Sequence, residues 1–305
     1  MTVPITDTPG WHLTHDLDRF LDRAGPHLRS TPAPHTVLLS VTDALRRSGL
    51  QAYGDEPPVF GTLVGEGGTV TGAWVRTPPR RLLLGTVPED AVESLAATLA
   101  DDQATAGLSG VTGRRPTVDA FATAWHTRTH TRTRTSTGAH PTPLRAERLY
   151  RLDTLTPPDP APPGTPRPAI EADRDLLRRW HVAFARDIGE RNLMDSDTWV
   201  DSRLMYAGLT LWEVDGTPVA LAGVTRRIAG QVRVAPVYTP PDQRRRGYAA
   251  AVTAEVSRAA RDGGADEVLL FTDLGNPTSN SVYQRIGYRP MGDFATYDFT
   301  ATATP

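Results

Sequence analysis

The sequence lacks two residue types whose chemistry would define whole classes of site. It contains no cysteine among its 305 residues, which excludes disulfide bonds, thiolate zinc sites and cysteine nucleophiles. It also contains no lysine, so its 33 basic residues are all arginine, and lysine Schiff bases and a P-loop lysine are excluded. No apolar run approaches the roughly 18–20 residues that span a bilayer. The absences leave enzymes and binding proteins that need neither thiol, lysine nor membrane-embedded groups.

The net charge and the absence of several motifs exclude further classes of function. The formal net charge of −2 gives no general attraction to nucleic acid or to acidic membranes. The first residues show no basic stretch followed by an apolar one, so no secretory signal is expected and we expect a cytoplasmic protein. HExxH, GxxxxGK[ST] and GxGxxG are absent, and His12 and His15 are too isolated for a metal site. We therefore expect a small-molecule partner, no metal, and a monomer or homodimer.

A proline-rich segment, TPPDPAPPGTPRP, occupies residues 156–168. Proline at this density blocks helices and sheet ladders and favours extended conformations, so the segment is typical of a semi-rigid linker. It predicts one domain over residues 1–155 and a second over residues 169–305.

The second half alternates helical and strand patterns. Asp197 is the expected N-cap of its second helix, and Asp215-Gly216 and Ala229-Gly230 are expected to form tight turns between strands. The run EVLLF is short and continuously apolar, as in a buried strand parallel to its predecessor. The predicted helices cover residues 171–188, 197–208, 247–263 and a stretch from Thr278 or Ser279, and the predicted strands cover 209–214, 218–228, 231–238, 267–271 and 291–299. This order predicts an α/β layer with helices on both faces.

The first half repeats that order more weakly, which predicts a duplicated domain. Its predicted helices lie near residues 15–25, 33–49, 88–100 and 116–127, and its strands near 58–64, 69–77, 80–85, 108–113 and 144–153. Between them, residues 126–140 alternate threonine with arginine or histidine. We expect an exposed strand or a mobile loop there, because a nucleic-acid contact would need interleaved aromatics and a larger basic field.

The segment TPPDQRRRGYAAAV joins a predicted strand to a predicted helix. A helix N-terminus leaves its first N–H groups without intrahelical partners and carries partial positive charge, so it can bind an anion. Gly247 allows close approach of the backbone, and the small Ala249 and Ala250 leave room. When this loop is considered alone, the alternative is a basic turn that is exposed to solvent and binds no ligand.

Two motifs resemble those of the GNAT superfamily of N-acetyltransferases. Residues 244–249, Arg-Arg-Arg-Gly-Tyr-Ala, resemble its coenzyme A pyrophosphate loop, and NPTSNSVYQRIGYRP at 276–290 resembles its later motif. The later motif is matched at Asn276, Ser279, Tyr283, Gly287 and Tyr288. The resemblance implies tandem GNAT-like α/β domains, each with a mixed central sheet flanked by helices. It also implies a splayed, V-shaped cofactor cleft in the C-terminal domain.

The resemblance further implies acetyl-CoA as cofactor and an acetyltransferase site. Tyr283 would protonate the departing thiolate, and the Val237 amide would meet the acetyl carbonyl. Backbone groups of Val237, Tyr238 and Thr239 would pair with pantetheine, and Pro236 fits where sheet pairing lapses. The remaining implied cofactor contacts are Arg244, Arg245, Arg246, Gly247, Tyr248, Ala249, Ala250, Asn276, Ser279 and Asn280.

The general base and the acceptor stay open. The candidate bases are His181, Glu190, Asp195 and Glu213. Trp199, Tyr206 and Trp212 either line the acceptor pocket or pack in the core. We expect transfer to a primary amine of a small molecule. A peptide or protein amine, and a non-catalytic acyl-CoA-binding module, are the alternatives.

The first half departs from the family pattern at the corresponding loop. Its segment RRLLLGTVPEDAVESLA has no Gly-x-Gly/Ala turn, and Glu89 and Asp90 stand at the predicted helix start. These acids satisfy the helix dipole and would repel a pyrophosphate. We expect this domain to be degenerate, without coenzyme A, and to support the second domain or the acceptor site.

Overall fold

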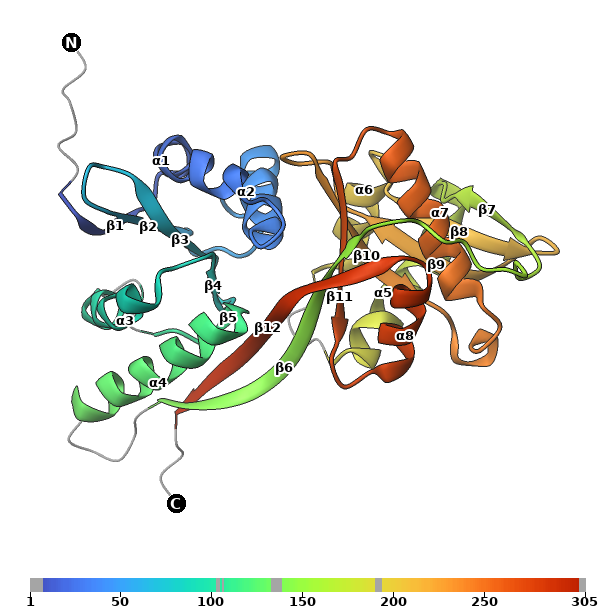
Figure 1. Cartoon of the computed structure of the whole chain (residues 1–305). Helices are drawn as coiled ribbons and strands as arrows, with labels where there is room; N and C mark the ends of the chain where they lie inside the picture. The colour runs from blue at the N-terminus through green and yellow to red at the C-terminus, as the bar shows by residue number, and fades with distance from the viewer. Residues whose placement is uncertain (1–7, 103–104, 106, 133–138, 190–193, 302–305) are drawn as a thin grey trace, which may run out of the picture. The chain divides into compact units, whose positions relative to one another are not determined.

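The structure is a computed structural model that describes residues 8–102, 105, 107–132, 139–189 and 194–301 (Figure 1). Its internal contacts divide the chain into one unit of residues 1–147 with 292–305 and another of residues 148–291. The domain limits that were predicted from the proline-rich segment, 1–155 and 169–305, differ from this division and stay a prediction. No helix in the described ranges is long and apolar enough to cross a membrane.

The first unit has a sheet in the order β1-β2-β3-β4-β5-β12. Neighbouring strands are antiparallel except β4 and β5, which are parallel. The elements are β1 Gly10–Thr14, α1 Leu17–Ser30, α2 Thr36–Ser48, β2 Val59–Val64, β3 Val70–Arg76, β4 Leu82–Leu84, η1 Glu89–Ala91, α3 Val92–Asp101, β5 Gly110–Arg114, α4 Arg115–Arg132 and β12 Tyr288–Ala301. Its core packs Trp74, Phe121 and Trp125 against Phe299 of β12.

The second unit has a sheet in the order β6-β11-β10-β9-β8-β7. Its strands β7 to β10 are antiparallel to their neighbours, and β10 is parallel to β11, as predicted for EVLLF. The elements are β6 Ala139–Leu152, β7 Thr165–Pro168, η2 Glu171–Asp173, α5 Arg174–Asp187, α6 Ser196–Leu204, β8 Leu209–Val214, β9 Thr217–Val224, β10 Gln231–Tyr238, η3 Pro241–Gln243, α7 Tyr248–Asp262, β11 Glu267–Asp273 and α8 Pro277–Arg285.

The two units have the same strand order, and each includes a parallel pair at the corresponding place, β4 with β5 and β10 with β11, which confirms the predicted tandem α/β architecture. In each sheet the last position is taken by the strand that follows the other unit's final helix. Thus β12, which follows α8, pairs with β5, and β6, which follows α4, lies beside β11. The duplicated units therefore exchange their last strands: β12 completes the strand order of the first unit, and β6 completes that of the second.

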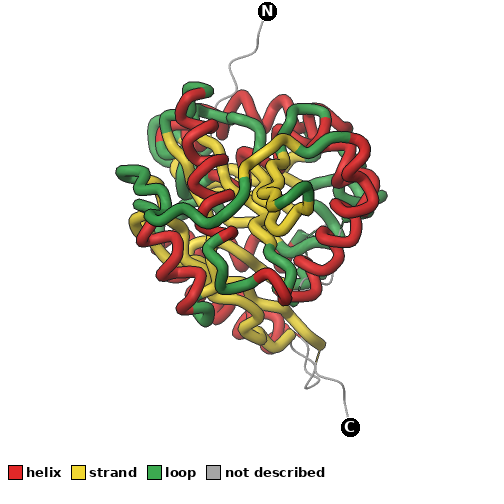
Figure 2. Tube along the Cα trace, turned by 90° about the vertical axis from the view of Figure 1, so that its right-hand side faces the viewer, coloured by secondary structure: helices red, strands yellow, loops and turns green. Residues whose placement is uncertain are grey.

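Helices cover both faces of the second unit's sheet (Figure 2). Successive side chains of a strand point to opposite faces. Ala220 and Ala222 accordingly pack in the cluster that contains Val252 of α7, while Leu221 packs with Leu177 of α5. The layering confirms helices on both faces and leaves the carboxyl ends of β10 and β11 between the two helix layers.

Several local predictions need correction. Helix α6 is capped by Asp195, whose side chain accepts the Thr198 amide at 2.9 Å, whereas Asp197 pairs with Arg178 at 3.3 Å. Residues 126–132 continue helix α4 rather than forming a strand or loop, because extending an existing helix is favourable and the Thr129 hydroxyl bonds the Trp125 carbonyl. Strands β1 and β7 were not predicted, and β7 lies inside the expected linker. The part of the alternating segment at 133–138 is outside the described residues.

Candidate active site

Strands β10 and β11 separate toward their carboxyl ends. Their paired residues run from Gln231 with Glu267 to Val234 with Leu270. Beyond Val234, β10 keeps its pairing with β9, after a register shift that surrounds Pro236. Proline has no N–H to donate to a ladder, so it suits the place where pairing lapses. The arrangement agrees with the predicted V-shaped opening between these strands.

An unsatisfied polar group lies directly after the last residue of β10. Val237 is half-buried and Tyr238 is buried, where its ring packs 5.6 Å from the Trp180 ring and burial raises its pKa. The Thr239 hydroxyl is buried and has no hydrogen-bond partner within the described part of the chain. A buried hydroxyl without a partner is costly. Its place at the end of the splayed strand fits a polar ligand.

The loop after β10 presents a run of free backbone amides. Arg245 and Gly247 adopt left-handed conformations, with φ of 63° and 86°. Helix α7 then begins at Tyr248 without a side-chain cap, and its first backbone bond runs from the Ala251 amide to the Gly247 carbonyl at 3.1 Å. Within the described residues, the amides from Arg245 to Ala250 donate to no protein acceptor. Left-handed turns at a helix N-terminus make an anion-binding concavity.

The three arginines of the loop have different surroundings. Arg244 donates from Nη2 to Asp187 at 2.6 Å and from Nε to the Thr239 carbonyl at 3.0 Å. Arg245 and Arg246 are exposed and have no partner in the ranges that the structure describes. The Arg244 guanidinium is therefore held by protein groups, whereas those of Arg245 and Arg246 have no partner among the described residues.

Gly247 lies against the proline-rich segment. A Cβ built on Gly247 would be 3.6 Å from Cβ of Pro162, an ordinary contact. The next residue, Pro163, accepts a hydrogen bond from the Trp212 indole at 2.9 Å, which anchors the segment to β8. Sequence reasoning missed Pro162 and Asp187 as neighbours of this loop, since neither lies near it in the sequence.

Helix α8 carries the predicted asparagine and serine contacts at its start. Asn276 caps the helix, with its Oδ1 accepting the Ser279 amide at 3.0 Å, and is exposed. The Asn280 amide donates to the carbonyls of Asp273 and Asn276 at 2.8 Å each, and its Oδ1 accepts from the buried Tyr150 hydroxyl at 2.8 Å. The side chains of Asn276 and Asn280 therefore have structural roles, and their cofactor contacts remain predictions.

Tyr283 differs from its neighbour Tyr288 in one respect that matters for chemistry. Burial raises the pKa of Tyr283 to about 12, and its hydroxyl has no hydrogen-bond partner among the described residues. The Tyr288 hydroxyl is 2.7 Å from that of Ser257, deep in the core. The two rings meet edge to face, 6.2 Å apart. Of these two tyrosines, only Tyr283 keeps a hydroxyl available for a ligand.

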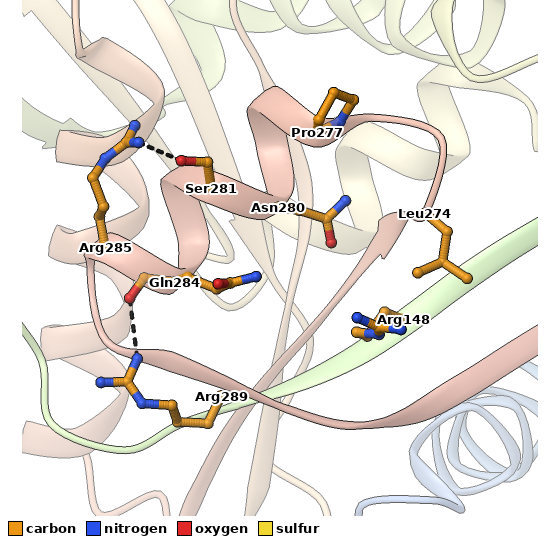
Figure 3. Close-up of a pocket in the computed structure, with 8 residues that line it drawn as sticks. All are labelled: Arg148, Leu274, Pro277, Asn280, Ser281, Gln284, Arg285 and Arg289. Carbon is orange, nitrogen blue, oxygen red and sulfur yellow. Dashed lines mark hydrogen bonds between the residues drawn. The ribbon is translucent and has the colours of Figure 1, made fainter.

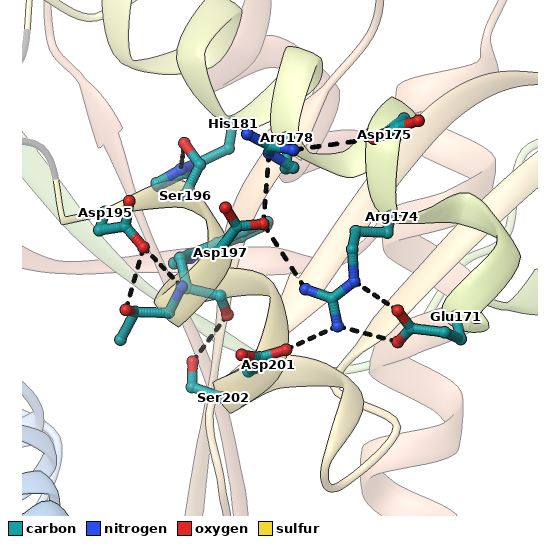
Figure 4. Close-up of polar contacts among 12 residues, drawn as sticks. Glu171, Arg174, Asp175, Arg178, His181, Asp195, Ser196, Asp197, Asp201 and Ser202 are labelled. Atoms are coloured by element: carbon teal, nitrogen blue, oxygen red, sulfur yellow. Dashed lines mark hydrogen bonds and ion pairs between the residues drawn. The ribbon is translucent and has the colours of Figure 1, made fainter.

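Two candidate bases lie between α5 and α6 (Figure 4). His181 is buried, stacks on Trp199 with ring centres 4.2 Å apart, and has its Nδ1 3.0 Å from the Ser196 hydroxyl. Burial and the nearby Arg203 lower its pKa to about 4, so it is neutral at pH 7. Asp195 is held by the Thr198 amide and hydroxyl as the helix cap, and these bonds lower its pKa. Neither group has the pKa near neutrality that a general base favours.

The other candidates also have structural partners. Glu213 forms an ion pair with Arg167, and Glu190 lies outside the described residues. Trp199 and Trp212 are both buried in hydrophobic clusters, and the Tyr206 hydroxyl donates to the Val224 carbonyl at 2.9 Å. Each of these described residues already has a structural role that does not involve an acceptor substrate. The structure therefore identifies neither the general base nor the residues that line an acceptor pocket.

The corresponding loop of the first unit is filled by protein groups. Glu89 and Asp90 form an exposed 3₁₀ turn ahead of α3. Before it, the Thr86 amide and hydroxyl meet Nε2 of the buried His35 at 3.1 and 2.8 Å, and a second contact joins the same hydroxyl to His27 at 3.2 Å. That this loop binds no pyrophosphate stays a prediction.

Residues 174–288 match the model of the acetyltransferase (GNAT) family. The matched segment runs from the first residue of α5 to the first residue of β12 and contains the splayed strands, the loop and Tyr283. Residues 174–288 therefore carry a GNAT acetyltransferase domain. The family uses acyl-CoA donors. Searching the curated proteins gave no match.

Solved structures show the same fold over nearly the whole chain. A Drosophila protein has a TM-score of 0.66 at 13% identity, with 96% of this chain and 99% of that chain covered. A GCN5-related N-acetyltransferase from Sphaerobacter thermophilus has a TM-score of 0.59 at 17% identity and 95% coverage of both chains. A GCN5-related N-acetyltransferase from Kribbella flavida reaches 0.52 at 18% identity, over 75% of this chain and 86% of that one. At these identities the likeness concerns the fold alone.

Proposed function

We propose that the protein is an acetyl-CoA-dependent N-acetyltransferase that acetylates a primary amine of a small molecule. The observation that carries the proposal is the run of unpartnered amides from Arg245 to Ala250, at the start of α7 and beside the splayed end of β10. Such a cradle suits a pyrophosphate, and the strand opening suits an extended pantetheine arm. The orphan hydroxyl of Thr239 lies between the two features in sequence and fits the same ligand.

Several residues of this chain would hold the cofactor. The amides from Arg245 to Ala250 would bind the pyrophosphate, with Arg245 and Arg246 adding charge. Backbone groups of residues 237–239 would pair with the pantetheine amides, and Asn276, Ser279 and Asn280 would border the arm. When bound, acetyl-CoA supplies an acetyl group activated as a thioester.

The chain's own groups would then assist attack by the amine. The Val237 amide would stabilise charge on the acetyl oxygen, as backbone N–H groups do at developing oxyanions. Tyr283 would donate its phenolic proton to the departing thiolate. Burial raises its pKa to about 12, so the phenol is protonated at neutral pH and carries the proton that this role requires. The amine is expected to arrive neutral, since His181 and Asp195 have lowered pKa values and Glu213 is paired with Arg167.

A thiol-release assay with acetyl-CoA and a panel of small amines, antibiotics and peptides tests the proposal. Release that depends on a small amine supports it. Release only with peptides would replace the acceptor class, and tight coenzyme A binding without any release would indicate a non-catalytic acyl-CoA-binding module.

Calorimetry of coenzyme A with Gly247→Glu tests the cradle separately. A carboxylate at the helix start would repel the pyrophosphate, so binding should be lost. If Gly247→Glu binds coenzyme A as tightly as the wild-type protein, the loop is not the cradle.

A further inference from the structure

A groove lined by six polar residues together with Leu274 and Pro277 follows the side of α8 in the second unit (Figure 3). It has a volume of about 600 Å³, within the range of small-molecule sites. Its polar lining residues are Arg148, Asn280, Ser281, Gln284, Arg285 and Arg289, and we call it the α8 groove. Three of the six carry guanidinium groups. No carboxylate belongs to the lining among the residues that the structure describes.

The floor of the α8 groove is held in place by a buried tyrosine. Tyr150 is fully buried, and its hydroxyl donates to Asn280 Oδ1 at 2.8 Å and accepts from Gln284 Nε2 at 3.0 Å. These two bonds fix which way the amides of Asn280 and Gln284 point. Polar groups that are positioned in advance bind a ligand at lower entropic cost.

Two of the three guanidinium groups in the α8 groove, those of Arg285 and Arg289, donate to uncharged acceptors. Arg285 donates to the Ser281 hydroxyl, and Arg289 donates to the carbonyls of Gln284 at 3.1 Å and Tyr288 at 3.2 Å. All of these acceptors are uncharged, and in the described ranges neither arginine has a carboxylate partner.

Other exposed arginines of the second unit, in contrast to Arg285 and Arg289, form ion pairs with carboxylates. Arg151, on the same strand as Arg148, pairs with Glu267 at 3.1 Å. Arg258 on α7 pairs with Glu255 at 2.8 Å and with Asp262 at 2.7 Å. Arg285 and Arg289 thus keep guanidinium edges that a planar oxyanion can meet in bidentate fashion.

We propose that the α8 groove is a binding site for a small polyanion bearing carboxylate or phosphate groups, separate from the pyrophosphate loop. The guanidinium groups of Arg285 and Arg289 would bind the oxyanion, and the Gln284 amide, held by Tyr150, would orient it. The groove includes no residue of the loop at 244–250. The groove shares only Asn280 with the proposed cofactor contacts, and titration in the presence of coenzyme A tests the two sites separately.

Calorimetric titration of the full-length protein tests the site, with citrate and inorganic phosphate as separate probes at low, fixed ionic strength. Each titration is done without coenzyme A and with saturating coenzyme A, which occupies the loop. We expect saturable binding of at least one probe, unchanged by coenzyme A. Binding of citrate alone assigns a polycarboxylate, and binding of phosphate alone assigns a phosphate group.

Arg285→Glu should weaken that binding at least about tenfold, because it replaces a charge-assisted contact by a repulsive one. Arg258→Glu, an equal charge change on an exposed residue of α7, should leave it within about twofold. The milder Arg285→Gln, which removes the charge from an exposed side chain without adding a new one, should also weaken it. Three results would overturn the proposal: no saturable binding, equal loss in Arg258→Glu, or displacement of the probe by coenzyme A.

Discussion

Arg244 and Asp187 are joined by an ion pair, with Arg244 Nη2 2.6 Å from Asp187 Oδ2. The pair links the pyrophosphate loop to the last residue of α5. Because Arg244 also donates to the Thr239 carbonyl, its guanidinium is tied to protein groups on two sides. The following two arginines have no such ties in the described part of the chain. Three arginines that look equivalent in the sequence therefore have different surroundings: Arg244 is tied to protein groups, and Arg245 and Arg246 have no partner among the described residues.

The double replacement Arg245→Ala/Arg246→Ala should weaken coenzyme A binding by about tenfold, or roughly 1.4 kcal/mol. Arg244→Ala should weaken it by less than about threefold, since a half-exposed ion pair contributes at most about 1 kcal/mol. Calorimetry of coenzyme A binding measures both. Equal losses, or a larger loss for Arg244→Ala, would show that Arg244 binds the cofactor despite its tether.

Gly247→Ala should disturb the cradle through backbone strain rather than crowding. The added Cβ fits beside Pro162 at 3.6 Å, but a left-handed φ of 86° costs a residue other than glycine about 1–2 kcal/mol. We expect a loss of about 1 kcal/mol in the free energy of unfolding, with weaker coenzyme A binding as the loop relaxes and its amides turn away.

Gly189→Ala is the matched control. Gly189 has a φ of 68° and open space around its would-be Cβ, so the strain is similar. Chemical denaturation should show a comparable loss of stability, while coenzyme A affinity stays unchanged. A loss of affinity in both variants would mean that strain anywhere near the loop suffices, and the specific role of Gly247 would be wrong.

Tyr283→Phe should lower turnover by about 100-fold or more, the size of a general-acid contribution. Its coenzyme A affinity should change by less than about twofold, because its hydroxyl has no partner among the described residues and the ring would remain. Tyr288→Phe is the comparison: it breaks the buried bond to Ser257 and should cost about 1–3 kcal/mol of stability without slowing the folded enzyme. Steady-state kinetics and thermal melts separate the two outcomes. Unchanged turnover in Tyr283→Phe would remove the assignment.

Much of the fold followed from local patterns, and the rest required tertiary contacts. The hydrophobic periodicity predicted α5, β10, α7 and β11, and glycine turns such as Asp215-Gly216 marked the hairpins. The strand exchange could not be predicted locally, because the sequence of a strand such as β6 does not specify which open sheet edge it joins.

The candidate site, like the fold, followed in part from local sequence patterns and in part depended on contacts between distant residues. The loop motif fixed the position of the cradle, since a glycine between a strand and a helix reports local backbone geometry. The tether of Arg244, the contact of Pro162 and the burial of His181 depend on residues far away in the sequence. The proline-rich segment illustrates the error this produces: its composition indicated a linker, but Trp212 and the β7–β8 pairing hold its second half on the sheet.

The stability of the protein should fall as pH drops from 6.5 to 4 because of His35. Its Nδ1 faces the Leu28 carbonyl at 3.2 Å, so Nδ1 carries the proton, and Nε2 accepts from the Thr86 amide. Burial, then the nearby His27, lowers its pKa to about 4, below the usual 6.5. The folded state thus favours neutral His35. Its contribution is fully present above pH 6.5 and is lost as pH falls toward 4, by about 3 kcal/mol in total.

Chemical denaturation at a series of pH values checks this expectation with His35→Gln. The variant should be less stable at pH 7, because the Thr86 contacts are disturbed, but its stability should depend less steeply on pH between 6.5 and 4. Part of the slope should persist, since His181 also has a pKa of about 4 and acts in the same direction. His130→Gln, at an exposed position of α4, should keep the full slope. If His35→Gln also keeps the full slope, protonation of His35 does not limit stability in acid.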